Sequence, residues 1–247
     1  MKLLLLVLLL AGARGQAGEP RLTIAVHNPT GAAIDDRGLR SLLHKAPQVC
    51  NLQVDPVPRV VDLAHRAALV DTPLLVLRGR GSFVLDQARQ SNLLLFLAAG
   101  GTVFIDAPDG RYEAPFNASA RALAAALFPD RELERLHKGH VLFQTYYLLD
   151  HAVGRVIERS YLEGINHSGR VALLISYNDL HGAWERDALG RHVHDVVPGR
   201  DVQRMQSFRL GVNLLLYALT LDYKADLVHI PEILKRRKLR DRGESRD

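Results

Sequence analysis

Continuous apolar runs alternate along the chain with segments in which apolar residues recur every three or four positions. Continuous runs are typical of strands buried on both faces, and the wider spacing is typical of helices with one buried side. The continuous runs predict strands at residues 22–27, 50–54, 73–77, 102–105 and 171–176. The helical spacing predicts helices at residues 35–45, 58–69, 84–98, 118–127 and 200–221. Two segments fit either strands or irregular inserts, namely residues 140–149 and 160–165.

Turn and cap residues agree with these boundaries. A turn cluster, NPTG, follows the first strand, and Gly100-Gly101 follows the third helix, where glycine accepts the left-handed cap conformation. Pro58 suits the first turn of a helix. Strands that alternate with helices of this length predict a mostly parallel sheet with helices on both faces. We therefore expect one α/β domain over residues 21–234.

The two ends of the chain differ from this pattern. Residues 1–15 combine a basic start at Lys2, an apolar run too short to span a bilayer, and small residues around Arg14. This predicts a signal peptide, with an uncleaved N-terminal anchor as the alternative. No later stretch is apolar enough to cross a membrane, so we expect an exported protein, periplasmic or otherwise extracytoplasmic, without a transmembrane span after cleavage.

The net charge of +5 is concentrated at the ends. The tail at 235–247, KRRKLRDRGESRD, carries a net +4, and residues 1–15 carry a net +2, so the rest of the chain has a net charge of −1. The basic balance therefore gives no reason to expect nucleic-acid binding. We expect the tail to be disordered, or to contact an anionic surface.

Polar residues follow several of the predicted strands. In open α/β sheets ligands bind at the carboxyl ends of the strands, close to the point where the strand order reverses. The residues expected at this edge include Asn28 after the first strand, Arg78 after PLLVL, Asp106 after TVFI, and Asn178 and Asp179 after VALLIS. Trp184 follows in the same segment and is expected either to line a pocket or to cover the core.

Two kinds of site fit the sequence poorly, a dinucleotide site and a site for nucleophilic catalysis. Gly79-x-Gly81 outlines a dinucleotide site, but Val84 occupies the third glycine position and the pair does not follow the first strand. The sequence contains no G-x-S-x-G nucleophile elbow. The candidate nucleophiles are badly placed: Cys50, Ser82 and Ser176. The lone Cys50 cannot form an intrachain disulfide and is expected to be buried.

Acid–base and metal chemistry remain as alternatives. Asp106 and Asp179 would converge at the sheet edge and form a pair of carboxylates, although Asp residues after strands also form turns and helix caps. His192-x-His194 would lie on one side of an extended strand and, with a nearby carboxylate, form a ligand set for a metal, although the spacing matches no specific zinc signature.

Four segments resemble the bacterial domain-of-unknown-function family 4159. They are GGTVFID, LFPD, NDL-x-x-AW and PGRDVQRMQSFRLGVNLLLYALTLDYKADLVHIP, and the resemblance extends from about Leu22 to Arg237. It implies a flavodoxin-like α/β fold similar to class I glutamine amidotransferase domains, and relatives in longer membrane-anchored chains of the cell envelope. The catalytic cysteine of those amidotransferases has no counterpart, because the corresponding strand ends at Asp106.

These observations favour an exported, non-catalytic domain of the cell envelope that binds a small ligand or a protein partner. The predicted site comprises Asn28, Arg78, Asp106, Asn178, Asp179 and Trp184, and no cofactor is expected. The alternative is a hydrolase acting on sugar or cell-wall material, with either Asp106 and Asp179 as acid and base or a metal at His192 and His194.

Overall fold

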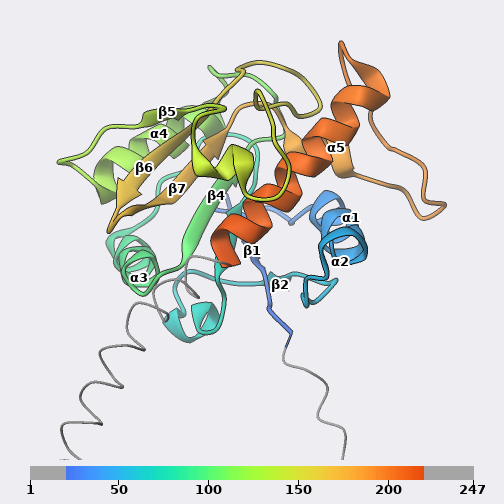
Figure 1. Ribbon diagram of the computed structural model, residues 1–247. Coiled ribbons are helices and arrows are strands. Elements are labelled where there is room, and N and C mark those ends of the chain that lie inside the picture. Colours follow the sequence, from blue (N-terminus) through green and yellow to red (C-terminus); the bar gives the residue numbers. More distant parts are fainter. Residues whose placement is uncertain (1–20, 220–247) are drawn as a thin grey trace, which may run out of the picture.

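The computed structural model of the protein describes residues 21–219, and all its named strands belong to one seven-stranded sheet (Figure 1). The strands are β1 (Ala25–His27), β2 (Arg59–Val60), β3 (Leu74–Leu77), β4 (Thr102–Asp106), β5 (Glu134–Leu136), β6 (Leu162–His167) and β7 (Arg170–Ser176). The helices are α1 (Arg37–Lys45), α2 (Pro47–Cys50), α3 (Gln87–Ala98), α4 (Pro115–Leu127) and α5 (Leu180–Trp184), with 3-10 turns η1 (Arg66–Leu69) and η2 (Val141–Gln144). One more helix covers residues 200–219 and is called the 200–219 helix below.

The sheet has the strand order of a flavodoxin-like fold. Strands β2, β1, β3, β4 and β7 are parallel and adjacent in that order, which is the order 2-1-3-4-5 when the parallel strands are counted along the chain. Strands β6 and β5 extend the sheet beyond β7 in antiparallel orientation. The expected α/β fold with a mostly parallel sheet is confirmed.

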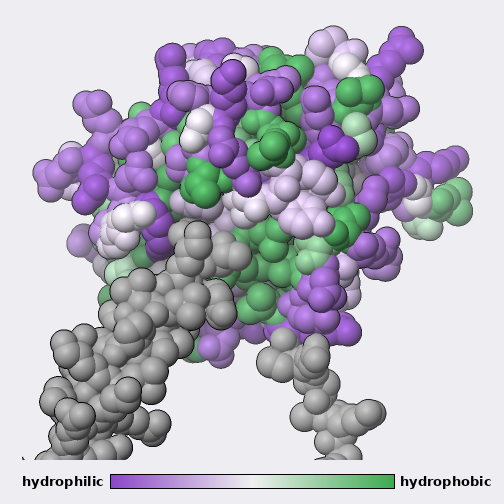
Figure 2. All heavy atoms as spheres, in the orientation of Figure 1, coloured by the Kyte–Doolittle hydropathy of each residue, from purple (hydrophilic) through white to green (hydrophobic). Residues whose placement is uncertain are grey.

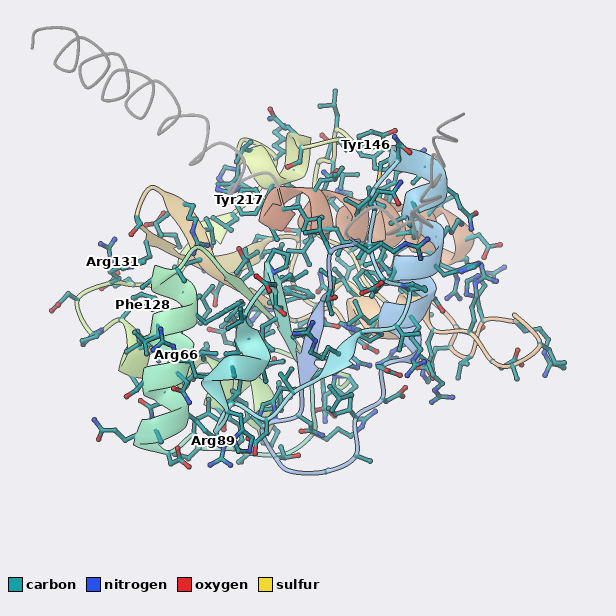
Figure 3. The ribbon with its side chains drawn as sticks, turned by 90° about the horizontal axis from the view of Figure 1, so that it is seen from below. Arg66, Arg89, Phe128, Arg131, Tyr146 and Tyr217 are labelled. Carbon is teal, nitrogen blue, oxygen red and sulfur yellow. The ribbon has the colours of Figure 1, made fainter. Side chains whose placement is uncertain are left out.

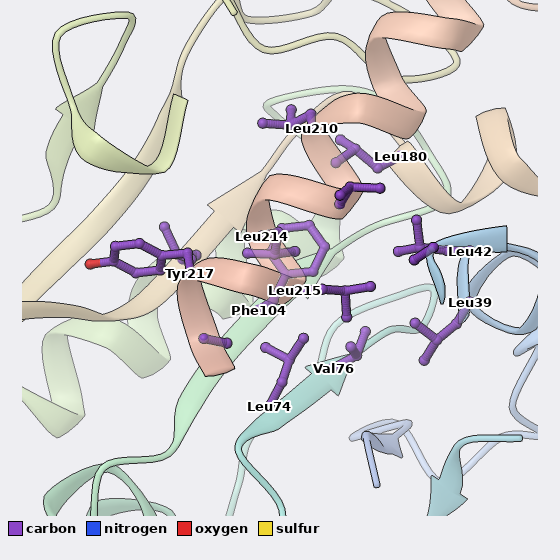
Figure 4. Packing of buried hydrophobic residues seen from close by; sticks show 14 of the residues in the cluster. Leu39, Leu42, Leu74, Val76, Phe104, Leu180, Leu210, Leu214, Leu215 and Tyr217 are labelled. Carbon is purple, nitrogen blue, oxygen red and sulfur yellow. The ribbon is translucent and has the colours of Figure 1, made fainter. Parts of the chain in front are cut away.

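Helices cover both faces of the sheet because side chains alternate between the faces along each central strand. Leu74 and Val76 of β3 pack on one face with α1, α5 and the 200–219 helix, whereas Leu75 and Leu77 pack on the other face with α3 and α4. Figure 4 shows the first of these cores, in which Phe104 lies among leucines of the surrounding helices. Strands buried on both faces explain the continuous apolar runs of the sequence.

The two faces can be told apart in the other views. Seen from below, Tyr217 and Tyr146 lie on the side of the 200–219 helix, and Arg66, Arg89 and Phe128 lie on the opposite side (Figure 3). In Figure 2 hydrophilic residues dominate the rim of the face that carries this helix, and apolar residues show through in its middle.

Two predicted elements are wrong. Residues 50–54 form no strand, because Pro47 starts the short helix α2 and Asn51 ends it in a left-handed conformation at φ 50°. Val54 forms only an isolated parallel bridge with Leu22, which precedes β1. Residues 58–69 form no continuous helix, because Arg59–Val60 pair with β1 as the edge strand β2 and only Arg66–Leu69 turn as a 3-10 helix.

The uncertain middle of the chain divides into different elements. Residues 141–144 form η2, and the segment predicted at 160–165 overlaps β6. Strand β5 and the short helix α5 had no sequence-based prediction.

Three predictions concern residues outside the described range 21–219: the signal peptide at 1–15, the basic tail at 235–247, and the end of the domain at 220–234. Within residues 21–219, no helix combines the length and the apolar character that crossing a membrane requires.

Candidate functional site

The carboxyl ends of four parallel strands bring most of the predicted site residues to one edge of the sheet. Asn28 follows β1, Arg78 follows β3, Asp106 ends β4, and Asn178 and Asp179 follow β7. The chain leaves β1 for β2 on one side and returns to β3 on the other side, so the strand order reverses between β1 and β3. In flavodoxin-like sheets this reversal is where ligands bind.

Arg78 lies at the centre of a buried cluster of ions. Its Nη1 atom donates to Asp106 Oδ2 at 3.2 Å and to Asp179 Oδ1 at 3.1 Å. Arg155 completes the cluster, since its Nε atom donates to the second oxygen of Asp179 at 2.6 Å. Two guanidinium groups thus balance two carboxylates. Charges buried to this extent are stable only when they are paired and hydrogen-bonded, and removing one partner typically costs about 3–5 kcal/mol.

Asp106 is fully buried and accepts hydrogen bonds from several donors. Besides Arg78, the backbone N–H groups of Leu180 and His181 donate to it, each at 3.1 Å, and the imidazole Nδ1 of His181 lies 2.8 Å from Oδ2. Burial by itself would raise the pKa of Asp106, but the hydrogen bonds from His181 and the charge of Arg78 outweigh it and hold this pKa below its usual value. Asp106 is therefore an ionised anchor for the start of α5.

His181 is held neutral next to this anchor. Burial and the charge of Arg78 lower its pKa, although Asp106 acts in the opposite direction. Because an ionised Asp106 can only accept, the proton of the neutral imidazole lies on Nδ1. Its Nε2 atom is buried without a hydrogen-bond partner among the described residues. The ring packs between Phe104 and Trp184, with centroid distances of 6.5 and 5.2 Å.

Asp179 joins the ion cluster to α5. It has a left-handed conformation at φ 52°, and its side chain caps the helix by accepting from Gly182 N at 3.0 Å. Asp is one of the few residues other than glycine that adopt this conformation at low cost, and it is a favoured N-cap. The same carboxylate therefore caps α5 and binds both arginines.

Asn178 forms hydrogen bonds with the backbone of the segment that carries Arg155. Its Oδ1 atom accepts from the backbone N–H groups of Glu158 and Arg159, both at 2.9 Å, and its Nδ2 atom donates to the carbonyls of Ala152 and Arg159 at 3.1 and 2.7 Å. Both donors and both acceptor positions of this fully buried amide are used. All hydrogen-bonding positions of the Asn178 side chain are thus used by backbone groups, and Asn178 does not line the pocket that contains Asn28 and Arg78.

A pocket of ≈ 420 Å³ lies at this edge of the sheet, and we call it the edge pocket. Its lining includes Asn28, Arg78, Arg80, Arg155, Asp179 and Glu185. Three of the six predicted site residues therefore meet here: Asn28, Arg78 and Asp179. Asp106 lies beneath the pocket floor, because it is fully buried under Arg78 and is not part of the lining.

Asn28 shapes the wall of the edge pocket. Its Oδ1 atom accepts from Thr30 N at 3.1 Å and from Thr30 Oγ1 at 2.8 Å, which closes the turn after β1. Gly79 passes so close that a Cβ atom there would lie 2.3 Å from Asn28 Oδ1 and 2.8 Å from a ring carbon of Phe116. Gly79, the first glycine of the Gly79-x-Gly81 pair, thus allows the backbone to pass close to the side chains of Asn28 and Phe116. Helix α3 begins only at Gln87, so the pair does not start a helix as a dinucleotide site requires.

Trp184 lies in a different pocket. A second cavity of ≈ 260 Å³, which we call the tryptophan pocket, is lined by Trp184, His192, Lys45, Arg186, Arg204 and Phe208, among others. His194 instead lines the edge pocket, where its Nε2 atom lies 3.1 Å from Glu185 Oε2.

The two histidines of the metal hypothesis therefore line different pockets. In residues 21–219 no group of three or more His, Cys, Asp and Glu side chains is arranged to hold a metal ion. A metal bound by His192 and His194 stays a prediction that metal analysis would test.

Neither Ser176 nor Cys50, two of the candidate nucleophiles, has an activating neighbour among residues 21–219. Ser176 is fully buried, and its Oγ atom accepts from Asn178 N at 3.2 Å. The Cys50 thiol, which is partly buried, donates to Ala46 O, and burial raises its pKa, so it is held as the unreactive thiol.

Sequence reasoning missed three residues of the site. Arg155 lies in an irregular segment without hydrophobic periodicity, and no local signal marks it. His181 and Glu185 are both buried in the described structure, at 1% and 2% exposure. The only signal for them was the density of polar residues after VALLIS, which does not distinguish buried partners from solvated side chains.

The chain is therefore a flavodoxin-like α/β domain with a buried ion cluster under a polar pocket at the carboxyl edge of its sheet. It belongs to the family described as Domain of unknown function (DUF4159), whose family model matches residues 21–219. The resemblance noted in the sequence is thus confirmed. No curated protein matches the chain.

Proposed function

We propose that this protein is an exported, non-catalytic domain of the cell envelope that binds a small anionic ligand in the edge pocket. The observation that carries the proposal is the position of this pocket. It lies where strand order reverses between β1 and β3, and Arg78, the first residue after β3, lies in its lining. This is the expected ligand position in a doubly wound sheet.

The hydrogen bonding of the arginines favours an anion. Among the described residues, every hydrogen bond of the Arg78 side chain comes from Nη1, which leaves Nε and Nη2 for a ligand. Arg155 donates through Nε to Asp179 and through Nη2 to Pro108 O, which leaves Nη1. Guanidinium groups bind carboxylate and phosphate oxygens in pairs, so a ligand with either group would match this arrangement.

The acidic residues of the lining have partners of their own. Arg37 binds Asp35 Oδ1 at 3.0 Å and Glu185 Oε1 at 2.6 Å, and His194 also contacts Glu185. These carboxylates therefore oppose a bound anion less than unpaired carboxylates would.

The arrangement of the two aspartates supports binding over hydrolysis. General acid–base catalysis needs both groups within hydrogen-bond reach of a substrate. Asp179 lines the edge pocket together with His194, but Asp106 is fully buried below it, with its oxygens engaged by donors and its pKa lowered. A hydrolase using Asp106 and Asp179 remains the alternative, and turnover of a cell-wall substrate that Asp179→Asn abolishes would favour it.

Export and the cell envelope rest on the apolar N-terminal run and on the family resemblance. The similarity to class I glutamine amidotransferase domains also stays a prediction. Fractionation of cells that produce the full chain, with N-terminal sequencing of the mature protein, tests export and the predicted cleavage near Gly15.

Thermal unfolding in the presence of simple anions tests the edge pocket. We expect inorganic phosphate or L-glutamate to raise Tm, because a ligand at a hundred times its Kd stabilises by about 2.7 kcal/mol. For a chain of this size that corresponds to a rise of roughly 5–11 °C. Arg155→Lys should reduce the rise, since lysine keeps the charge but cannot contact Asp179, Pro108 O and a ligand oxygen in the fixed geometry of the guanidinium group.

The matched control is Arg191→Lys, because Arg191 is exposed, pairs with Asp187 and lies outside the lining of the edge pocket. It should leave the ligand-induced rise intact. An absence of any anion effect, or an equal effect in Arg155→Lys and wild type, would exclude anion binding at this pocket.

A further inference from the structure

The tryptophan pocket is lined by none of the residues of the ion cluster and is formed by four separate segments. Helix α1 contributes Lys45, α5 contributes Trp184, the loop after α5 contributes Arg186, and the 200–219 helix contributes Arg204 and Phe208. These elements lie together at the right of Figure 1. Of the predicted ligand-site residues only Trp184 lines this cavity, and no residue of the ion cluster does.

Three cations line this pocket without an acidic partner. Lys45, Arg186 and Arg204 take part in none of the ion pairs found in residues 21–219. Arg186 donates to Gly190 O, and Arg204 donates to the carbonyls of Ala183 and His194, both at 2.7 Å. Carbonyls orient these side chains but do not neutralise them. Asp201 is the single acidic residue in the lining.

The positive potential also acts on His192 in the same lining. Burial lowers the pKa of His192, and the charges of Arg204 and Arg186 lower it further. The imidazole is therefore neutral at pH 7, and the fixed charge of the pocket comes from the lysine and the two arginines.

Buried donors next to the pocket lack partners. Trp184 is 4% exposed, and its indole Nε1 has no hydrogen-bond partner among the described residues. Arg204 Nε and Ser207 Oγ, one turn apart on the 200–219 helix, are also buried without a hydrogen-bond partner among the described residues. Buried donors are usually satisfied, and two of these three belong to residues of the pocket lining, Trp184 and Arg204.

Apolar side chains continue from the pocket onto the surface. Met205 in the lining is 45% exposed, and Val202 and Leu189, on the helix and on the loop after α5, are 63% and 76% exposed. On this side of Figure 2 hydrophilic and apolar residues lie side by side. Exposed apolar residues around a small aromatic cavity are typical of a protein interface with a central anchor.

We propose that the tryptophan pocket binds an acidic segment of a partner protein, which inserts one apolar side chain against Trp184 and Phe208. Lys45, Arg186 and Arg204, which form no ion pair within residues 21–219, select the acidic residues on either side of this anchor. The volume of ≈ 260 Å³ suits one side chain, whereas pockets for small-molecule ligands usually measure about 300–1,000 Å³. This site is separate from the edge pocket, and its occupant is a different class of molecule.

Selection from a library of random peptides displayed on phage tests the chemistry of the partner. We expect peptides enriched on the wild-type protein to carry Asp or Glu beside a Phe, Trp or Leu. These peptides should no longer bind the Met205→Asp variant. The matched control is Val84→Asp, which introduces the same charge at an exposed apolar residue outside both the pocket lining and the apolar surface beside it. It should retain the peptides.

The fluorescence of Trp184 then measures binding directly, because it is the only tryptophan of the chain. A selected peptide should shift its emission in a saturable way, and Lys45→Glu should weaken binding at least about tenfold, since reversing a charge beside an acidic partner costs roughly 1.4 kcal/mol or more. Lys138→Glu, an exposed change outside the pocket lining, should leave the affinity unchanged.

Three results would overturn the proposal: no enrichment, enrichment without acidic residues, or peptides that bind Met205→Asp as well as wild type. If no peptide is enriched while dodecanoate shifts the emission of Trp184, the occupant is a small amphipathic anion. Phosphate binding at the edge pocket can succeed or fail independently of each of these results.

Discussion

Asn178→Asp tests how the buried amide holds the loop that carries Arg155. The change replaces one atom and keeps the shape of the side chain, so packing is preserved. The oxygen that accepts from Glu158 N and Arg159 N is retained. The nitrogen that donates to Ala152 O and Arg159 O becomes a second carboxylate oxygen, 3.1 and 2.7 Å from these carbonyls if nothing moves.

The expected fall in the free energy of unfolding follows from the hydrogen bonds that the variant loses and the charge that it buries. Each buried carbonyl left without a donor costs about 1–3 kcal/mol. The variant also buries a new charge without a compensating cation in contact, which typically costs about 3–5 kcal/mol when a buried pair is broken. Hydrogen bonds from the two N–H groups to the charged oxygen offset part of this. We therefore expect the free energy of unfolding to fall by about 3–5 kcal/mol near pH 8.

The effect should depend on pH with a definite sign. Burial raises the pKa of the introduced carboxyl in the folded state above its unfolded value of about 3.9. A group with a raised folded pKa stabilises the protein below the unfolded pKa and loses that contribution as pH rises through the folded pKa. Near pH 5 the protonated acid can donate to Arg159 O, so the deficit should shrink to about 1–3 kcal/mol.

Urea unfolding of wild type and variant at both pH values, followed by circular dichroism, measures these differences. Asn51→Asp makes the same chemical change at an exposed residue and should shift stability by less than about 0.5 kcal/mol at either pH. A deficit for Asn178→Asp that is as large at pH 5 as at pH 8, or smaller than about 1 kcal/mol throughout, would contradict the described hydrogen bonding.

Three further predictions concern neighbouring parts of the site. The pKa of His181 in the folded protein lies below its ordinary value of 6.5, so below pH 6.5 this histidine binds a proton more readily in the unfolded chain. The free energy of unfolding of the wild type should therefore fall as pH decreases below 6.5. This contribution is at most about 1.4 kcal/mol per pH unit and should disappear in His181→Gln, as measured by urea unfolding across the pH range. Gly79→Ala should cost about 1–3 kcal/mol in the same assay, because its Cβ would lie 2.3 Å from Asn28 Oδ1. Elemental analysis of the purified protein should find no stoichiometric metal, since His192 and His194 line different pockets, and a bound metal lost in His194→Ala would refute this.

The central strands could be predicted because their signal is local. Residues 74–77 and 102–106 are buried along their whole length, so the hydrophobic run and the strand coincide. The edge of the sheet could not be predicted in the same way. Both residues of β2 are exposed, and their strand conformation comes from pairing with β1, more than thirty positions earlier in the sequence.

Part of the site could be predicted from the positions of the central strands. Residues after the carboxyl ends of parallel strands meet at one edge whatever the details of the loops, which brought Asn28, Arg78 and Asp179 together. The roles of Asn178 and Trp184 did not follow, although they belong to the same motif. The amide of Asn178 is hydrogen-bonded to backbone groups, and Trp184 lines a separate pocket.

The sequence by itself determined the α/β class, the buried strands and the family, because hydrophobic periodicity and motif order are properties of neighbouring residues. Only the tertiary structure decided which polar residues are paired and which are available. Arg78 and Asp179 are 101 positions apart, and Arg155 reaches the same carboxylate from an irregular segment. Whether a charge is neutralised, desolvated or left facing a pocket depends on such distant partners, so the edge pocket and the cations that line the tryptophan pocket became visible only in the folded chain.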